Sequence, residues 1–208
     1  MVEGRGFLPK NEFLHGGEFQ YFRIKPVLWE RNLPKLKEMK IDVVSSYVPW
    51  IWHELEEGHF DFTGETHLVR NLVHFLSLVR ENDLKFIIRP GPYIYAEYNG
   101  YGVPFWVREK YPECLIIDEK GKKRVHVSYG HPKLMELVEK WYSALYDVVK
   151  EFVEDGTIVA IQLDNETGLF LAGEVLNKVD YNPYIVSMFR LWLKEKYGDN
   201  GEEVCFKA

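Results

Sequence analysis

The stretch Ile41–Val48, IDVVSSYV, indicates how the chain folds, because a β-branched run of this length is typical of a buried strand. Three further segments have a similar character and lie on both sides of it along the chain. They are Phe13–Tyr21, Lys85–Ile88 (KFII) and Ile158–Leu163 (IVAIQL). We therefore predict four strands.

A helix is expected after each of these strands. The predicted helices are Leu28–Lys40, His67–Glu81, Pro132–Val153 and Pro183–Tyr197. Pro34 must bend the first of them or delay its start. Four strand–helix units are typical of a parallel α/β sheet, either open and doubly wound or closed as a (β/α)8 barrel. No glycine-rich phosphate loop follows the first strand, which argues against a dinucleotide-binding fold.

The composition narrows the classes of function. The 208 residues carry a formal net charge of −6, which argues against a nucleic-acid or membrane-surface binder, because both need a basic face. No stretch is long and apolar enough for a membrane span or a signal peptide, so we expect a cytoplasmic protein. Cys114 and Cys205 suggest neither a disulfide framework nor a zinc site, and no metal or cofactor is expected. No repeat or linker is visible, so we expect one domain.

Polar and aromatic residues follow the expected strands, at the ends where parallel α/β folds collect their functional groups. The fourth strand runs into Asp164, Asn165 and Glu166. Alternation places Glu166 on a polar side, and Ile161 and Leu163 on an apolar side that would pack against helices. A carboxylic acid at this point could protonate a glycosidic oxygen. It could equally cap a helix or pair with an arginine, and the spacing alone favours this structural role.

Four short segments can be compared with known families. They are Gly16–Arg23 (GGEFQYFR), Tyr47–Trp50 (YVPW), Arg89–Glu97 (RPGPYIYAE) and Gln162–Gly168 (QLDNETG). Together they resemble glycoside hydrolase family 35, which includes β-galactosidases and archaeal exo-β-glucosaminidases. The resemblance implies an α/β fold of the TIM-barrel glycosidase type. A complete barrel takes about 250 residues, so residues 1–208 would form about the first four βα units, the N-terminal half of the catalytic barrel.

The resemblance also implies roles for individual residues. Glu166 would be the general acid/base, and Asn165 would be a hydrogen-bond partner of the substituent at C2 of the sugar. Tyr47, Ala96 and Glu97 would line the subsite for the non-reducing sugar. Glu97 could instead be a solvated or structural charge.

Other residues near the expected subsite leave the choice of sugar open. Gln20 stands where the family usually has His, Asp164 stands where it usually has Glu, and Glu18 adds a carboxylate. A β-galactoside is expected first, but an added carboxylate would favour a cationic amino sugar, as for an exo-β-glucosaminidase. Arg89 is expected to brace carboxylates rather than to touch sugar. Glu54 is expected to make either a structural ion pair or a substrate contact.

Hydrolysis with retention needs a second carboxylate about 5 Å from the acid. In the family this nucleophile comes from the seventh strand, and no residue of this chain matches it. The first hypothesis is a truncated or split glycosidase, with its nucleophile on a second polypeptide. The second is a non-catalytic carbohydrate-binding half-barrel. The third is a pair of copies that complete a barrel, with a residue such as Glu97 as nucleophile. The expected ligand is a β-galactoside or β-glucosaminide oligosaccharide.

Overall fold

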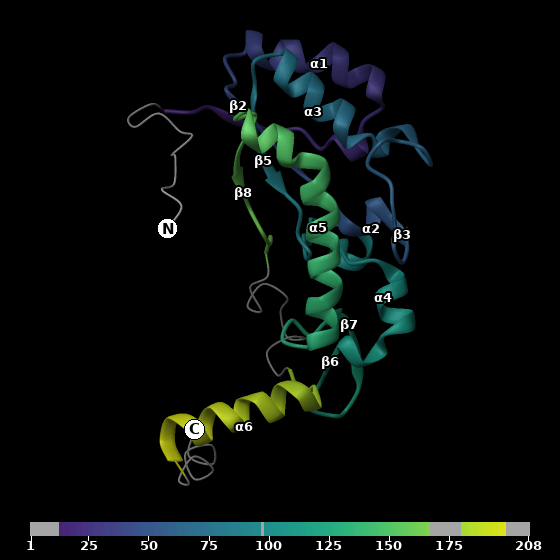
Figure 1. Cartoon of the computed structure of the whole chain (residues 1–208), viewed down its shortest axis with the longest axis vertical. Coiled ribbons are helices and arrows are strands. Elements are labelled where there is room, and N and C mark those ends of the chain that lie inside the picture. Colours follow the sequence, from purple (N-terminus) through teal and green to yellow (C-terminus); the bar gives the residue numbers. More distant parts are fainter. Residues whose placement is uncertain (1–12, 97, 167–179, 199–208) are drawn as a thin grey trace. The chain divides into compact units, whose positions relative to one another are not determined.

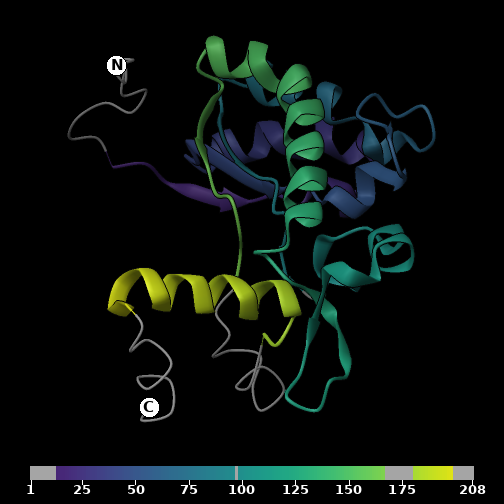
Figure 2. The same ribbon diagram turned by 60° about the horizontal axis from the view of Figure 1, so that its bottom comes forward.

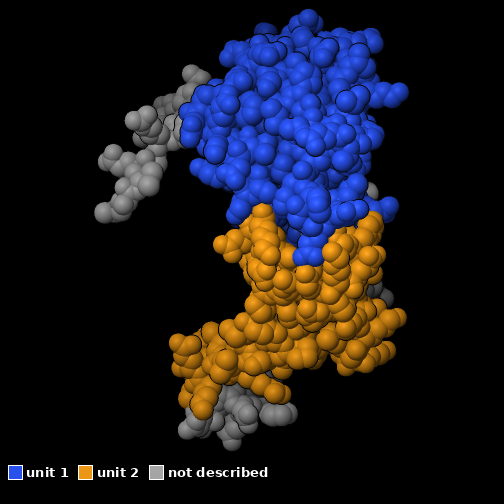
Figure 3. Space-filling view, turned by 45° about the vertical axis from the view of Figure 1, so that its right-hand side comes forward, with its two compact units in different colours: residues 1–104, 141–167 blue, residues 105–140, 168–208 orange. Residues whose placement is uncertain are grey.

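The computed structural model describes residues 13–96, 98–166 and 180–198. The chain divides into two compact units, which Figure 3 shows in different colours. Unit 1 comprises residues 1–104 and 141–167, and unit 2 comprises residues 105–140 and 168–208. Unit 1 contains a parallel sheet, and unit 2 contains an antiparallel hairpin.

The centre of unit 1 is a four-stranded parallel sheet (Figure 1). Its strands, in their order across the sheet, are β1 (Gly16–Glu18), β2 (Val43–Tyr47), β5 (Lys85–Arg89) and β8 (Ile158–Ile161). Tyr47 lies opposite Arg89, so the carboxyl ends of the two central strands coincide. Ile88 lies opposite Ile161, which brings the end of β8 to the same edge of the sheet.

Helices separate these strands along the chain. α1 (Pro26–Glu38) precedes β2, α3 (Leu72–Glu81) precedes β5, and α5 (Pro132–Glu154) precedes β8. α1 and α3 lie side by side (Figure 1). Pro26 occupies the first turn of α1, where its missing N–H removes no helical hydrogen bond, whereas Pro34 lies inside the helix. The four predicted strands and these three helices are confirmed, although β1, β2, β8 and α3 are shorter than predicted.

Two clusters of aromatic rings form much of the core of unit 1. In the first, Tyr21, Trp29 and Phe75 are fully buried, and the ring centroids of Tyr21 and Phe75 are 4.9 Å apart. In the second, Trp50 stacks on Trp141 with centroids 6.3 Å apart. His53, Phe60 and Phe62 also lie with their rings against Trp141. These large buried rings pack α1 against α3, and they pack the second part of α5 against residues 50–62, the segment that follows β2.

The expectation that Ile161 and Leu163 pack against helices is wrong. The strand β8 ends at Ile161, and these two residues are 56% and 57% exposed. β8 also lies at the edge of the described sheet and pairs there with β5 alone. Within the described residues, the outer edge of β8 is therefore open.

Short elements that the sequence did not predict complete unit 1. They are α2 (Trp50–His53), β3 (Glu54–Glu56), β4 (His59–Phe60) and 3-10 turns at Tyr21–Arg23, Leu68–Arg70 and Asn99–Gly102. β3 and β4 pair in antiparallel fashion just after β2. They form a small hairpin near the end of β2 that the apolar pattern of the chain does not reveal.

Unit 2 contains α4 (Phe105–Lys110), a 3-10 turn at Pro112–Cys114, and the hairpin of β6 (Leu115–Ile117) and β7 (Lys123–Val127), none of them predicted. The helix α6 (Pro183–Tyr197) matches its predicted range and begins beside this hairpin (Figure 2). Asn182 caps α6, because its side-chain oxygen accepts a hydrogen bond from the N–H of Tyr184 at 3.0 Å. Its Nδ2 donates to the Leu115 carbonyl, also at 3.0 Å. None of the described helices is long and apolar enough to cross a membrane.

Candidate active site

The residues singled out by the sequence meet at the carboxyl edge of the sheet in unit 1. Arg89 is the last residue of β5, and the chain then turns through Pro90, Gly91 and Pro92. The Trp141 indole donates to the Pro90 carbonyl at 3.2 Å, which attaches this turn to α5. The segment after β8 joins the same loop, since the Asn165 N–H donates to the Tyr93 carbonyl at 3.1 Å. Two segments far apart in the sequence therefore form one side of the site.

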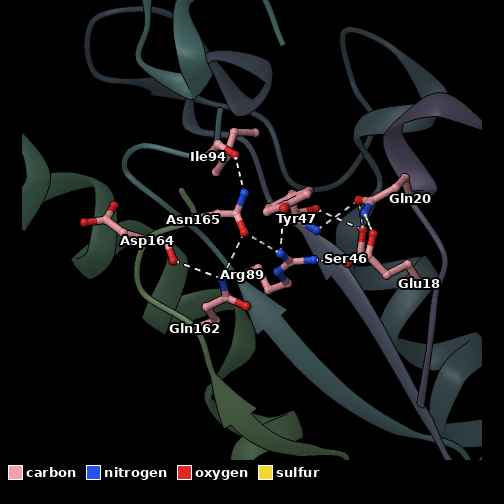
Figure 4. A network of polar contacts seen from close by, with 9 residues as sticks. All are labelled: Glu18, Gln20, Ser46, Tyr47, Arg89, Ile94, Gln162, Asp164 and Asn165. Atoms are coloured by element: carbon pink, nitrogen blue, oxygen red, sulfur yellow. Dashed lines mark hydrogen bonds and ion pairs between the residues drawn. The ribbon is translucent and has the colours of Figure 1, made fainter. Parts of the chain in front are cut away.

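Arg89 is the hub of the polar network in Figure 4. Its side chain is 9% exposed and forms an ion pair with Glu18. Its Nη2 donates to the Tyr47 hydroxyl at 2.5 Å and to Asn165 Oδ1 at 2.8 Å. The guanidinium also lies 3.8 Å from the centre of the Tyr47 ring. Arg89 was expected to brace carboxylates; it pairs with one, Glu18, and it also holds two of the expected sugar-binding residues, Tyr47 and Asn165.

Asn165 is held by hydrogen bonds at both ends of its side-chain amide (Figure 4). Its Oδ1 accepts from Arg89 and, at 3.2 Å, from Nε2 of Gln162. Its Nδ2 donates to the Ile94 carbonyl at 3.0 Å. Gln162 also donates to the Asp164 carbonyl at 3.0 Å, which closes the turn that carries Asn165. The amide is thus fixed in one orientation at the edge of the sheet.

Glu18 and Gln20 extend the network to β1. Gln20 Nε2 donates to Glu18 at 2.9 Å, and Gln20 Oε1 accepts from the Tyr47 N–H at 3.1 Å and the Ser46 hydroxyl at 3.2 Å. The Glu18 side chain is 57% exposed although it is paired with Arg89. Gln20, in the place of the usual histidine, therefore connects the ends of β1 and β2 and orients the added carboxylate.

Glu166 lies directly after this network and differs from it. The residue is exposed, and its backbone adopts a φ of +54°, which a residue with a side chain rarely adopts. Among the described residues its carboxylate forms neither a hydrogen bond nor an ion pair. The alternative structural roles, a helix cap or an arginine pair, therefore find no partner in the described part of the chain. The carboxylate is accessible to a ligand.

The loop after β5 carries Ala96 and Glu97. Tyr95 and Ala96 both have positive φ angles, of 48° and 47°, and the Ala96 carbonyl accepts from Arg23 at 2.8 Å. Two adjacent non-glycine residues in the left-handed region indicate a loop whose shape is imposed by its contacts. Glu97 lies outside the described residues. The structure thus links Tyr47 and Asn165 through Arg89, and it attaches the loop of Ala96 to Arg23.

Glu54 and His53 belong to the core rather than to the accessible site. Glu54 is buried and accepts hydrogen bonds from the Trp50 indole and, at 2.6 Å, from the Gly58 N–H, so its structural role is the one that the geometry supports. Burial lowers the pKa of His53 to about 4. No group of three or more His, Cys, Asp or Glu side chains within residues 13–96, 98–166 and 180–198 could hold a metal ion.

Sequence reasoning missed two contributors to the site. The Ile94 carbonyl is a backbone group, and a backbone group leaves no signature in the residue type. Ser46 is fully buried and donates to Gln20, but a serine within a strand is too common to attract notice. Gln162 was visible as a polar residue at the end of the predicted fourth strand, yet only the turn after β8 shows that it reaches Asn165.

The model of the glycosyl hydrolases family 35 matches residues 9–205 of this chain. The chain belongs to that family. A β-1,2-glucosyltransferase of Ignavibacterium album is 40% identical over 192 residues, which are 89% of this chain and 26% of that protein. An exo-β-D-glucosaminidase of Pyrococcus horikoshii is 37% identical, over 88% of this chain and 25% of that protein. A β-galactosidase of Mus musculus is 32% identical, over 85% of this chain and 25% of that protein.

Among solved structures, a crystal structure of the β-galactosidase from the psychrophilic Marinomonas ef1 matches with a TM-score of 0.67 at 20% identity. The match covers 89% of this chain and 26% of that one. The expected fold, part of a TIM-barrel glycosidase, is therefore confirmed. This family 35 chain spans about a quarter of the length of the relatives it matches.

Proposed function

We propose that the chain supplies the acid/base side of a retaining glycoside hydrolase site of the β-galactosidase type, which removes terminal non-reducing β-linked sugars. One observation carries the proposal: Asn165 is held by three side-chain hydrogen bonds, while the adjacent Glu166 is exposed and makes none among the described residues. A fixed amide can orient a sugar, and an open carboxylic acid can transfer a proton to it. Membership of family 35 supports this assignment.

The reaction is a double displacement. Glu166 protonates the glycosidic oxygen as that bond breaks, and a nucleophilic carboxylate attacks the anomeric carbon to form a glycosyl–enzyme ester. Glu166, now ionised, takes a proton from water, and the resulting attack on the same carbon releases the sugar and the carboxylate. Tyr47, Ala96 and Glu97 line the subsite for the non-reducing sugar, and Asn165 contacts its C2 substituent.

The nucleophile comes, in this proposal, from a second polypeptide or from a second copy of the chain. The open edge of β8 supports this assignment, because Ile161 and Leu163 are exposed beside it and an apolar strand edge favours pairing with a further strand. If the edge stays open, the chain is a carbohydrate-binding half-barrel without catalysis. The cytoplasmic location stays a prediction.

Two other activities have support from the comparisons. Exo-β-glucosaminidase activity is favoured by the relative from Pyrococcus horikoshii and by the exposed Glu18 carboxylate. Glycosyl transfer is favoured by the relative from Ignavibacterium album, and it would share the first displacement. A sugar hydroxyl would then replace water in the second displacement. The three activities use the same acid and differ in the sugar or in the acceptor.

The deciding experiment compares aryl β-galactoside, β-glucoside and β-glucosaminide substrates with the chain and its Glu166→Gln variant. For substrates with poor leaving groups, we expect the variant to lose about 10²- to 10⁴-fold in rate, the usual contribution of a general acid. Glu56→Gln, at an exposed carboxylate of the same unit, is the matched control. Equal rates for Glu166→Gln and the unmodified chain would remove Glu166 from the acid role. Sugar binding without turnover would indicate a half-site that awaits its nucleophile.

A further inference from the structure

The hydrogen-bonding roles of the Asn165 amide follow unambiguously from its partners. The Arg89 guanidinium can only donate, so the atom 2.8 Å from it must be the amide oxygen. The Ile94 carbonyl can only accept, so the atom 3.0 Å from it must be the amide nitrogen. Gln162 is assigned in the same way, because its Nε2 also donates to the Asp164 carbonyl. Neither amide can be turned over without breaking these bonds.

These partners leave Asn165 with a single unused function. An amide oxygen has two lone pairs, and Arg89 and Gln162 occupy both. An amide nitrogen has two hydrogens, and the Ile94 carbonyl takes one. Within the described residues the other N–H has no acceptor. The residue can therefore donate one hydrogen bond to a ligand, and it has no lone pair left with which to accept one.

We propose that this polarity makes the site selective for sugars whose C2 substituent accepts a hydrogen bond, and that it discriminates against a C2 ammonium group. The inference rests on the proposed function, in which Asn165 contacts that substituent. A 2-hydroxyl group accepts the spare N–H, whereas a protonated 2-amino group has hydrogens alone to offer. The substrate class is then the neutral β-galactosides and β-glucosides rather than the β-glucosaminides.

The charge in hydrogen-bond contact with Asn165 acts in the same direction. The cationic Arg89 lies in hydrogen-bond contact with Asn165 and is almost fully buried, so it repels an ammonium group placed at the amide. Glu18 is one of the carboxylates at the site that would attract a cation, but it already forms an ion pair with Arg89 and a hydrogen bond with Gln20. Arg89 and Gln162 are thus positioning residues that set specificity through Asn165.

The test uses non-hydrolysable aryl 1-thio-β-D-glucosides that carry either a 2-hydroxyl or a 2-amino group, with binding measured by calorimetry. At a pH where the amine is protonated, we expect the 2-amino ligand to bind about tenfold more weakly, within the usual cost of an unpaired polar group. As the pH rises and the amine loses its proton, its lone pair becomes available and the difference should shrink. The 2-hydroxyl ligand corrects for titration of the protein groups at the site. Those groups are Glu18, Tyr47, Arg89, Asp164 and Glu166.

Two substitutions of glutamine separate the amide from the Glu18 carboxylate. Gln162→Met frees one lone pair of the Asn165 oxygen, so it should narrow the discrimination several-fold. Gln20→Met leaves every contact of Asn165 in place, so it should leave the discrimination unchanged. If Gln20→Met alone reduces the difference in affinity between the two ligands, the selectivity is due to Glu18 and the inference is overturned.

The unmodified chain decides the question even if a variant fails to fold. Equal or tighter binding of the protonated 2-amino ligand would overturn the inference and leave the proposed function intact. If neither ligand binds, the proposed function fails, and the inference fails with it.

Discussion

The buried histidine of unit 1 should make the protein sensitive to mild acid. His53 is fully buried, and burial is the main cause that lowers its pKa from 6.5 to about 4. Its Nδ1 lies 2.6 Å from the Asp61 carbonyl, which can only accept, so Nδ1 carries the proton of the neutral ring. Its Nε2 then accepts from the Tyr21 hydroxyl at 2.5 Å. Protonation would remove that acceptor and place a charge in the core.

The size of the effect follows from the two pKa values. Between pH 6.5 and about 4, the unfolded chain binds a proton at His53 that the folded chain does not, so the free energy of unfolding falls as the pH falls. The difference between the two pKa values corresponds to about 3 kcal/mol of unfolding free energy, of which about 2 kcal/mol is lost between pH 7 and pH 4.5. Above pH 6.5 this residue contributes no further change, and below about pH 4 both states are protonated.

Urea denaturation at pH 7, 6, 5 and 4.5 measures this loss. Tryptophan fluorescence is a suitable probe, because the ring of Trp141 lies 6.3 Å from that of His53. The variant His53→Gln cannot titrate, so we expect its free energy of unfolding to depend less on pH by about 2 kcal/mol over this range. His59→Gln, at an exposed histidine of the neighbouring hairpin, should keep the pH dependence of the unmodified chain.

A second titrating group lies near His53 but acts in another range. Desolvation alone would raise the pKa of Asp61, but hydrogen bonds from Thr66, Gly64 and Glu65 outweigh it and lower the pKa to about 2. Its contribution to stability is therefore lost only below about pH 3.8, outside the range of the experiment. The reasoning about His53 is refuted if the unmodified chain and His53→Gln lose stability equally between pH 7 and pH 4.5.

Two further substitutions test the construction of the site. Arg89→Lys should weaken sugar binding about tenfold, because one ammonium group cannot reproduce the planar fork that holds Glu18, Tyr47 and Asn165. Arg80→Lys, at a partly exposed arginine paired on the surface, is the control. Equal sugar affinities of Arg89→Lys and the unmodified chain would contradict the role of Arg89 as the hub. Gly102→Ala should cost about 1–3 kcal/mol of unfolding free energy, since its φ is +89° and the new Cβ would lie 2.8 Å from Ile94 Cγ1. Gly58→Ala is the control, because its φ of +82° gives the same backbone strain but no atom lies within 4 Å of the new Cβ. If thermal denaturation shows that both variants lose the same stability, the close contact at Gly102 is relieved without cost.

The sequence by itself determined the main elements and the family. Strand runs such as Ile41–Val48, and helices such as Pro183–Tyr197, are visible because their apolar residues recur with a local period, and a local period survives whatever the chain does elsewhere. The motif around Asn165 and Glu166 was recognised because its residues are contiguous, so that it can be compared directly with the motif of a family. The hairpin of β6 and β7 was missed because β6 is only three residues long and β7, KRVHV, contains no continuous apolar run.

Only the tertiary structure decided how the site is built. Arg89 and Asn165 are 76 residues apart, so no local pattern could predict that one holds the other. The role of Ile94 depends on a backbone carbonyl, which every residue possesses. The exposure of Ile161 and Leu163 depends on what packs against the sheet, which the alternation of apolar residues along a strand does not reveal. Strand order and hydrogen-bond direction are properties of contacts between distant segments, and they alone left Asn165 with a single N–H to offer.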